Sequence, residues 1–299
     1  MTNAEIEAFI AVCEYKNISK AAEKFYISQS SLSTKIKTLE EKIGCPLFTR
    51  SKGSRNITLT EEGHKFLELA LKYQEIVNEM MSVGIKSRPP KLRVSSIDSM
   101  GTYLFTPVYE QFMYRMPNII LEIQDMESHP AYVSMEAGLT DLSFTVSRRE
   151  SKKVITFKAF SEPMIFVCSS LSSFPSTVGL SDLDVKNEIY IPWFETFMQW
   201  HDEIFGNKRH PQIQLQIMSQ LEFFLAKPNN WAVVPASAAY GLTKNPSIEK
   251  RPISFSVPNR VTNCLYVPDD SKECLVSCFL ECLREHLSKM AHMGIEIYI

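Results

Sequence analysis

A change of periodicity divides the sequence near residues 87–90. Before it, apolar residues recur at steps of three and four, the spacing of helices. After it, short apolar runs alternate with helical segments, the pattern of an α/β domain. Pro89 and Pro90 separate the two patterns because consecutive prolines end a helix. A chain of 299 residues is long enough for about two domains, so we place a domain boundary here.

Composition narrows the class of protein. Hydrophobic residues make up 44% of the chain and charged residues 22%, which suits a globular protein. No apolar run approaches the ~18 residues of a membrane span, and the N-terminus lacks the basic and apolar regions of a secretory signal. The cysteines number seven, and an odd number argues against a disulfide framework. We therefore expect a cytoplasmic protein with reduced thiols and no membrane partner.

The sequence lacks the motifs of the commonest enzyme classes. It has no Gly-x-Gly, no His-Glu-x-x-His and no Gly-x-Ser-x-Gly. One stripe of thiol and imidazole groups recurs at every fourth position: Cys274, Cys278, Cys282 and His286. A metal site or redox sensing through two of these thiols stays open as an alternative, but cysteine also packs as a small hydrophobe beside residues such as Phe279. We predict neither an enzyme nor a cofactor or metal site.

Positive charge is concentrated in residues 16–58. Nine Lys or Arg residues stand there against three acidic residues, whereas the whole chain has a net charge of −2. A basic stretch on a mildly acidic protein is typical of a site that binds a polyanion. A solvated basic face explains the charge alone equally well.

Capping residues predict three successive helices before residue 45. The predicted caps are Thr2, Ser19 and Ser28, and the third helix ends at Ile43, before Gly44. On this helix the apolar residues fall within an arc of about 60° and must face a core. The opposite face carries small hydroxyl and basic residues, which suit close approach to a DNA groove. The pattern predicts a helix-turn-helix, with a generic three-helix bundle as the alternative. The predicted DNA contacts of this part are Ser28, Gln29, Ser30, Ser33, Thr34, Lys35 and Lys37.

A short hairpin is predicted after the third helix. An apolar pair, Leu47-Phe48, and an alternating segment at 57–60 flank a basic turn around Gly53. Beside a helix-turn-helix, such a hairpin is a wing that contacts the DNA backbone or minor groove. Its predicted DNA contacts are Arg50, Lys52 and Arg55.

The motifs of residues 17–63 resemble the DNA-binding domain of LysR-type transcriptional regulators. The matching positions run in register: Ser19, Ala21-Ala22, Ser28-Gln29, Ser33, Ile36, Leu39-Glu40, Gly44, Leu47-Phe48, Arg50, Leu59-Thr60 and Gly63. The resemblance implies a protein that binds double-stranded DNA and is not an enzyme.

A long helix is predicted from a cap at Thr60 to about Ile85. Its apolar residues follow a heptad pattern, which predicts a dimerisation seam. Burial within its own domain and a scaffold that binds another protein are the alternatives. The resemblance also implies a homodimer or homotetramer. The predicted seam residues are Phe66, Ala70, Tyr73, Val77 and Met80.

Alternating strands and helices after residue 90 predict two small α/β subdomains with a parallel sheet. Their order resembles the periplasmic-binding-protein-like effector domain of the LysR family, joined by crossings near Val146 and Val267. The fold class is therefore α/β, with an N-terminal winged helix-turn-helix and a long linker helix. The predicted boundaries are 1–59, 60–88 and 89–299, the last divided into subdomain I (89–161 and 267–299) and subdomain II (162–266).

A cleft between two such subdomains predicts a small-molecule effector site. Ser99 stands between a strand and a helix, where a hydroxyl and backbone N–H groups favour an anion such as a carboxylate. Alternatively, Ser99 caps its own helix and the aromatic residues only pack. The predicted effector contacts are Ser99, Met100, Gly101, Ser128, Arg148, Trp193, Phe194 and Thr196.

Together these patterns predict a sequence-specific DNA-binding transcription regulator that a small, anionic effector modulates. The rival interpretation is a catalytic or ligand-binding α/β protein whose N-terminal helices serve assembly only. It requires clustered reactive groups, whereas His129, His201 and His210 are scattered in the sequence.

Overall fold

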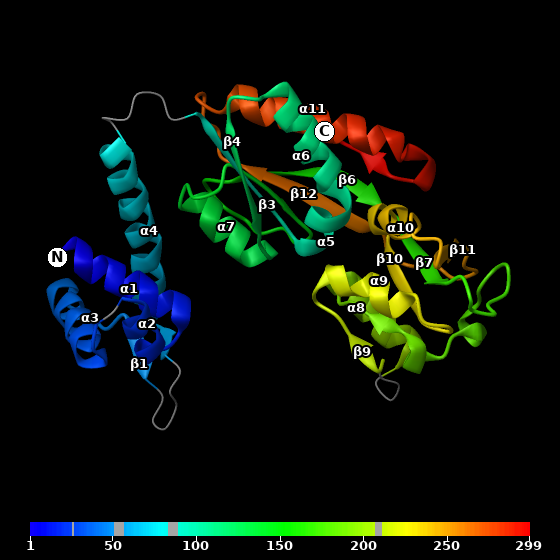
Figure 1. Cartoon of the computed structure of the whole chain (residues 1–299), viewed down its shortest axis with the longest axis horizontal. Helices are drawn as coiled ribbons and strands as arrows, with labels where there is room; N and C mark the ends of the chain where they lie inside the picture. The colour runs from blue at the N-terminus through cyan, green and yellow to red at the C-terminus, as the bar shows by residue number, and fades with distance from the viewer. Residues whose placement is uncertain (26, 51–56, 83–88, 207–210) are drawn as a thin grey trace. The chain divides into compact units, whose positions relative to one another are not determined.

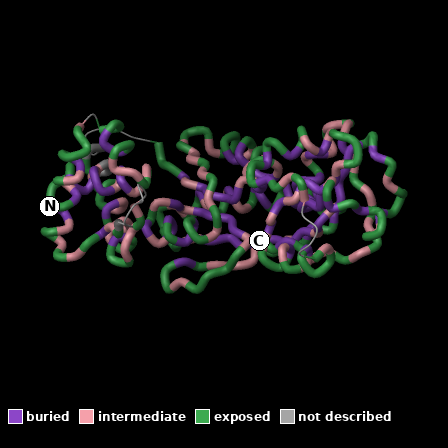
Figure 2. The backbone as a smooth tube through the Cα atoms, turned by 90° about the horizontal axis from the view of Figure 1, so that it is seen from below, coloured by how far each residue is buried: buried purple, intermediate pink, exposed green. Residues whose placement is uncertain are grey.

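A computed structural model describes the chain except for residues 26, 51–56, 83–88 and 207–210 (Figure 1). Contacts divide it into two units. The first comprises Met1–Arg88 with Ala137–Leu139, and the second comprises Pro89–Glu136 with Thr140–Ile299. In each unit the buried segments lie inside and the exposed ones at the periphery (Figure 2).

The first unit is a three-helix domain with a hairpin and a long helix. Its elements are α1 (Asn3–Tyr15), α2 (Ile18–Lys24), α3 (Gln29–Ile43), the antiparallel strands β1 (Phe48–Arg50) and β2 (Ile57–Leu59), and α4 (Glu61–Ser82). The caps at Thr2, Ser28 and Thr60 are confirmed, because each side chain accepts a backbone N–H of its helix. The predicted cap at Ser19 is wrong: Asn17 Oδ1 accepts the N–H groups of Ser19 and Lys20, so α2 begins earlier.

The start of the hairpin is bound by a carboxylate of α3 and lies close to the backbone of α4. Glu40 Oε1 accepts the backbone N–H groups of Leu47 (2.8 Å) and Phe48 (3.2 Å). A Cβ atom added to Gly63 would lie 2.1 Å from the Leu47 carbonyl oxygen, so only glycine fits at this point of α4. These contacts explain why a carboxylate and a glycine occur at these positions of the motif.

The structure corrects the predicted seam on α4. Ala70 is buried and Phe66 is half-buried, and both pack in the core of the first unit with Phe9. The exposed apolar residues among those described on this helix also have steps of 4-3-4: the predicted Tyr73 and Met80 stand there with Leu69 and Ile76, which the prediction did not include. A heptad pattern cannot distinguish these two faces, because burial against a domain and burial against a partner both select apolar residues.

A six-stranded mixed sheet forms subdomain I of the second unit. Its order is β13-β6-β12-β5-β3-β4. The strands are β3 (Lys91–Ser96), β4 (Ile120–Asp125), β5 (Leu142–Thr145), β6 (Ile155–Glu162), β12 (Arg260–Tyr266) and β13 (Glu296–Ile297). Only β3 pairs in parallel, with β4 and β5. The expected parallel pairing is confirmed for β3, β4 and β5, whereas β6, β12 and β13 extend the sheet with antiparallel pairs.

Helices cover both faces of this sheet (Figure 1). They are α5 (Asp98–Met100), the π-helical η1 (Gly101–Phe105), α6 (Thr106–Arg115), α7 (Ser128–Glu136), α11 (Glu273–Lys289) and the 3-10 turn η5 (Ala291–Met293). On the side of α6 and α11, Phe105, Phe144 and Phe279 pack with centroid distances of 4.8–6.2 Å. On the side of α7, Tyr132 and Leu265 form a separate small core.

Subdomain II contains a three-stranded antiparallel sheet of order β10-β7-β11 and a short parallel pair, β8 and β9. Its strands are β7 (Met164–Ser169), β8 (Ile189–Tyr190), β9 (Ile213–Gln214), β10 (Trp231–Pro235) and β11 (Ile248–Arg251). Its helices are η2 (Leu180–Asp182), η3 (Val185–Asn187), α8 (Glu195–Phe205), η4 (Met218–Gln220), α9 (Leu221–Leu225) and α10 (Ala236–Leu242).

The crossings between the subdomains lie away from Val146 and Val267. Because β6 and β12 both belong to the six-stranded sheet, the chain crosses at Pro163 and again between β11 and β12. The expected crossings near Val146 and Val267 are wrong, and we take subdomain I as 89–162 with 260–299 and subdomain II as 163–259. The sequence-based prediction did not include β6, although the alternating pattern Ile155-Thr-Phe-Lys-Ala-Phe is typical of a strand.

All seven cysteines are described, and all are free thiols. Cys282 is fully buried with Phe279 and Leu283, which agrees with its interpretation as a packing residue. Within the described residues, no group of three His, Cys, Asp or Glu side chains is placed to hold a metal ion.

The nearly buried His286 on α11 predicts a pH-dependent stability. Burial, and then the charge of Lys289, lower the pKa of His286 from 6.5. The unfolded chain therefore binds a proton more readily, and the free energy of unfolding is expected to fall as the pH drops below 6.5. Urea denaturation at a series of pH values measures this fall. His286→Gln should reduce the fall, whereas His129→Gln, at an exposed position, should leave it unchanged; an equal fall in both variants would contradict the assignment.

Candidate DNA-binding surface and ligand cavity

The helix α3 has one buried face and one exposed polar face. Leu32, Ile36 and Leu39 are at most 2% exposed and pack in the core of the first unit. The side chains predicted to contact DNA lie on the other faces, as expected from the helical spacing. Ser28, Gln29, Ser30, Thr34 and Lys37 are exposed, and Ser33 and Lys35 are half-buried.

Local hydrogen bonds orient this polar face. The Ser28 and Ser30 hydroxyl oxygens lie 2.9 Å apart, and Thr34 Oγ1 donates to the Ser30 carbonyl. Gln29 Oε1 accepts from the Ser19 hydroxyl at 3.1 Å, which leaves the Gln29 amide nitrogen available as a donor. Lys37 lies 3.6 Å from Glu41, and both side chains are mostly exposed, so this ion pair is weak and easily exchanged for a phosphate.

The hairpin is described at its base only. Arg50 ends β1, and Phe48–Arg50 pairs with Ile57–Leu59. The predicted contacts Lys52 and Arg55 lie outside the described residues.

A cavity of about 410 Å³ lies between subdomains I and II. Two of the predicted effector contacts, Ser99 and Trp193, line it. The wall from subdomain I consists of Ile97, Asp98, Ser99, Glu127 and Val146; the wall from subdomain II consists of Ile191, Pro192, Trp193, Leu215, Gln216 and Met218. The volume is in the range of small-molecule pockets, roughly 300–1,000 Å³.

Two hydrogen bonds join the subdomains at this cavity. Asp98 Oδ2 accepts the Met218 backbone N–H at 2.8 Å, and the Tyr103 hydroxyl donates to the Met218 carbonyl at 3.0 Å. Tyr103 also lies against Gly241, where an added Cβ would come within 2.8 Å of its ring. Asp98 and Tyr103 of subdomain I therefore bind the part of the cavity wall that Met218 of subdomain II contributes.

Two of the backbone groups predicted to bind an anion at the start of α5 are already hydrogen-bonded. The backbone N–H groups of Met100 and Gly101 both donate to the Ile97 carbonyl, at 2.9 and 3.2 Å, and so are not available to a ligand. Asp98 occupies the first turn of this helix. Since a helix N-terminus favours negative charge, the chain supplies its own carboxylate where an anion was expected.

A buried ion pair lies behind Ser99. Arg260 and Glu162 are fully buried cross-strand neighbours, and two guanidinium nitrogens donate to Glu162 Oε1 at 2.7 and 3.0 Å. Arg260 also donates to the Ser99 hydroxyl (2.9 Å) and the Ser237 hydroxyl (3.3 Å), and its guanidinium lies 5.8 Å from the centre of the Trp193 ring. Ser99 does not cap its helix; it binds a residue 161 positions away, a distance that no sequence spacing reveals.

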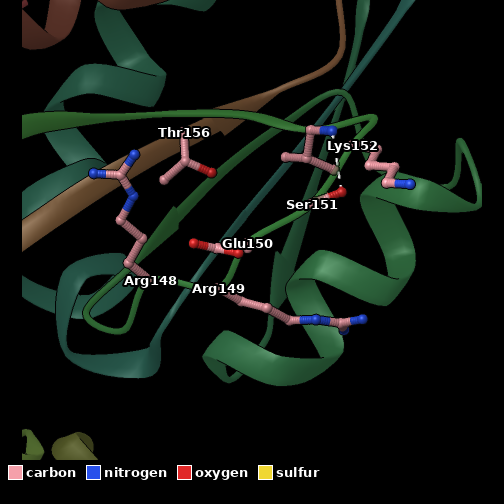
Figure 3. Close-up of a pocket in the computed structure, with 7 residues that line it drawn as sticks. Arg148, Arg149, Glu150, Ser151, Lys152 and Thr156 are labelled. Carbon is pink, nitrogen blue, oxygen red and sulfur yellow. Dashed lines mark hydrogen bonds between the residues drawn. The ribbon is translucent and has the colours of Figure 1, made fainter.

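Arg148 lies at a different pocket from Ser99. This surface pocket of about 490 Å³ is lined by residues of the loop between β5 and β6 and by Thr156. Figure 3 shows Arg148 beside Thr156, while Arg149 leaves the loop in another direction. The structure therefore does not bring Arg148 together with the cavity lining.

The remaining predicted effector contacts also lie outside the lining. Ser128 Oγ accepts the Ser147 N–H, Phe194 packs against Phe197, and Thr196 is exposed at the start of α8. Trp193 is 6% exposed, and its indole N–H donates to the Val233 carbonyl at 2.7 Å, so its ring is fixed in the cavity wall.

Two family models match the chain along most of its length. The model described as "Bacterial regulatory helix-turn-helix protein, lysR family" matches residues 4–64, and "LysR substrate binding domain" matches residues 87–288. The chain belongs to the LysR family. The α3 face lies within the first match and the ligand cavity within the second. LysR-family proteins are transcription regulators rather than enzymes, in agreement with the sequence-based expectation.

Curated relatives of this LysR-family chain align over part of its length. OxyR of Escherichia coli is 24% identical over 168 residues, and BenM of Acinetobacter baylyi is 32% identical over 138 residues. YcgK of Bacillus subtilis is 35% identical over 164 residues. These alignments cover 46–55% of the chain and 45–54% of the relatives, so the chain spans about half the length of the curated relatives it matches.

Solved structures of other LysR-family proteins share the fold across the chain. CbnR covers 96% of this chain and 99% of its own at a TM-score of 0.65 and 20% identity. Full-length OxyR of Pseudomonas aeruginosa covers 95% of both chains at a TM-score of 0.60 and 22% identity. No helix in the described part of the chain is both long and apolar enough to cross a membrane.

Proposed function

We propose that this LysR-family chain is a transcription regulator that binds double-stranded DNA as a homo-oligomer and responds to a small molecule. The observation that carries the proposal is the exposed face of α3, where hydroxyl, amide and lysine groups stand opposite a fully apolar, buried face. A helix with such a face fits a major groove, where its polar side chains meet base edges and phosphates. A regulator of bacterial genes works in the cytoplasm, and we place the chain there.

The proposed division of labour follows the side-chain chemistry. Lys35 and Lys37 bind phosphates and supply affinity without sequence preference. Gln29, Ser30, Ser33 and Thr34 face the base edges, where amide and hydroxyl groups read donor and acceptor patterns. CbnR, which has a similar fold, was crystallised with its target DNA, which supports DNA binding by this chain.

Lys37→Ala is expected to weaken binding to all DNA sequences by a similar factor. Because one phosphate contact is lost, the slope of log K against log[salt] should fall by about 1. Fluorescence anisotropy with a fragment selected from a random pool and with random DNA measures both quantities. Ser33→Ala should instead reduce the ratio between the two affinities.

Lys65→Ala is the matched control for Lys37→Ala. Lys65 also forms an exposed pair with a glutamate one turn away, at 2.8 Å, but it lies on α4. It should leave DNA affinity unchanged. Equal losses in both lysine variants, or no fragment preferred over random DNA, would count against the proposed surface.

The proposed oligomer forms through α4. Leu69 is 61% exposed, Ile76 54% and Met80 67%, so one side of the helix presents an apolar stripe with heptad spacing. Pairing of two copies removes this stripe from water and places two α3 helices on a two-fold symmetric DNA site. A dimer, or a tetramer built from dimers, follows from this pairing.

The proposed effector site is the cavity lined by Ser99 and Trp193. A ligand there touches both subdomains and so favours one relative orientation of them over another, which is the physical basis of a ligand-driven population shift. Burial raises the pKa of Cys168 and Cys282 to about 11, and such thiols hold little of the reactive thiolate.

A further inference from the structure

We propose that the cavity between the subdomains binds an organic cation, an amine or amidinium group carried on an apolar or aromatic body. The inference rests on the proposed function, because it names the ligand class of the proposed effector site. It reverses the sequence-based expectation of an anionic effector.

The wall of the cavity is mostly apolar and rigid. Seven of its eleven lining residues are apolar: Ile97, Val146, Ile191, Pro192, Trp193, Leu215 and Met218. Trp193 is fixed by its bond to the Val233 carbonyl, and Ile97 and Ile191 are buried. Such a wall accommodates an apolar ligand body, and the face of an indole ring also attracts a cation.

The charges that line the cavity are all negative. Asp98 and Glu127 are the charged residues of the lining, and Glu127 is exposed and forms no ion pair within the described residues. Asp125, at the end of β4, lies close to Asp98: burial, and then the charge of Asp98, raise its pKa. Three carboxylates therefore gather where β3 and β4 end, and each adds to the repulsion of an anion.

Within the described residues, the lining of the cavity contains no Lys, Arg or His side chain that could hold an anion. The charge of Arg260 is neutralised by Glu162, and Arg260 has no exposed surface. The N–H groups of Met100 and Gly101 donate to the Ile97 carbonyl, and Arg148 lines the other pocket (Figure 3). The polar groups that remain in the lining, Ser99 and Gln216, are uncharged. An ammonium group thus meets unneutralised carboxylates, whereas a carboxylate meets no cation.

Three probes with the same aromatic body test the ligand class. Benzylamine is a cation at neutral pH, benzyl alcohol is neutral and benzoate is an anion. Binding of each to the full-length protein is measured by ligand-observed NMR titration at low salt. We expect benzylamine to bind at least about tenfold more tightly than benzoate, with benzyl alcohol between them.

Isosteric variants locate the effect. The double variant Asp98→Asn with Glu127→Gln removes both charges of the lining and keeps an acceptor oxygen for the Met218 N–H, so it should strongly reduce the preference for the amine. Glu150→Gln, which removes an exposed carboxylate from the other pocket, is the matched control and should keep it.

These binding measurements test the ligand class independently of the proposed DNA-binding function. Benzoate binding as tightly as benzylamine, no binding of either, or an unchanged preference in the double variant would overturn the inference. The DNA-binding measurements with Lys37→Ala and Ser33→Ala do not depend on these results, so the proposed regulator would stand or fall on its own test.

Discussion

Arg260→Met is expected to lower the free energy of unfolding of the second unit by about 3–5 kcal/mol. The substitution leaves Glu162 charged and fully buried, with the Ser237 backbone N–H (2.7 Å) as its remaining donor. Breaking one side of a buried ion pair has this cost because the other charge has no water to solvate it. Urea denaturation of the full-length protein, followed by Trp fluorescence, measures the loss.

Two further variants separate the buried charge from the loss of packing. Arg260→Met with Glu162→Met removes both charges and should recover most of the stability, since an apolar pair can replace a buried ion pair. Arg115→Met breaks an arginine–glutamate pair of 2.7 Å in which the side chains are 32% and 49% exposed, and should cost less than about 1 kcal/mol. If Arg115→Met and Arg260→Met lower the free energy of unfolding equally, the buried ion pair does not stabilise the region where the chain passes between the subdomains.

Ile76→Glu is expected to dissociate the proposed dimer. Each dimer loses two apolar side chains from the interface and gains two charges there, so the dissociation constant should rise at least about 100-fold. Analytical ultracentrifugation measures the change in mass. DNA affinity should fall with it, because a monomer engages one half-site only.

Gln74→Glu is the control for this variant. It adds the same charge to an exposed position of α4, away from the apolar stripe, and should leave both the mass and the DNA affinity unchanged. A wild-type protein that sediments as a monomer, or an Ile76→Glu variant that remains a dimer, would refute pairing through this helix.

The buried pair also connects the cavity to the crossings of the chain. Arg260 begins β12 and Glu162 ends β6, so both stand where the chain passes between the subdomains. Ser99 belongs to subdomain I and Ser237 to subdomain II, and both hydroxyls accept from the same guanidinium. A ligand that displaces Ser99 or the Trp193 ring therefore acts one contact away from both crossings.

The first unit could be predicted closely from the sequence because its signals are local. Thr2, Ser28 and Thr60 each bind an N–H three residues on, so the cap and its partner stand together in the chain. The error at Ser19 is of the same local kind, since Asn17 is an equally good cap two residues earlier.

The cavity between the subdomains could be predicted only in part: two of the eight predicted contacts, Ser99 and Trp193, line it, and the charges of its lining could not be predicted. The strand–turn–helix pattern around Ser99 located one wall correctly. The hydrogen-bond partners of the polar side chains in this wall are distant in the sequence: the partner of Asp98 is 120 positions away and the partner of Ser99 is 161 positions away. The helical pattern of α4 likewise did not show which apolar face packs inside the domain.

Sequence alone determined the helices and the hairpin of the first unit, the polar face of α3 and the family, because helix periodicity, caps and motifs act over a few residues. Tertiary structure decided where the chain crosses between subdomains, which side of α4 stays exposed and which charges the cavity presents. These properties depend on pairings such as Arg260 with Glu162, 98 positions apart. Contacts of that kind form only when the sheet assembles, and the sequence around each residue does not indicate which distant residue it will contact.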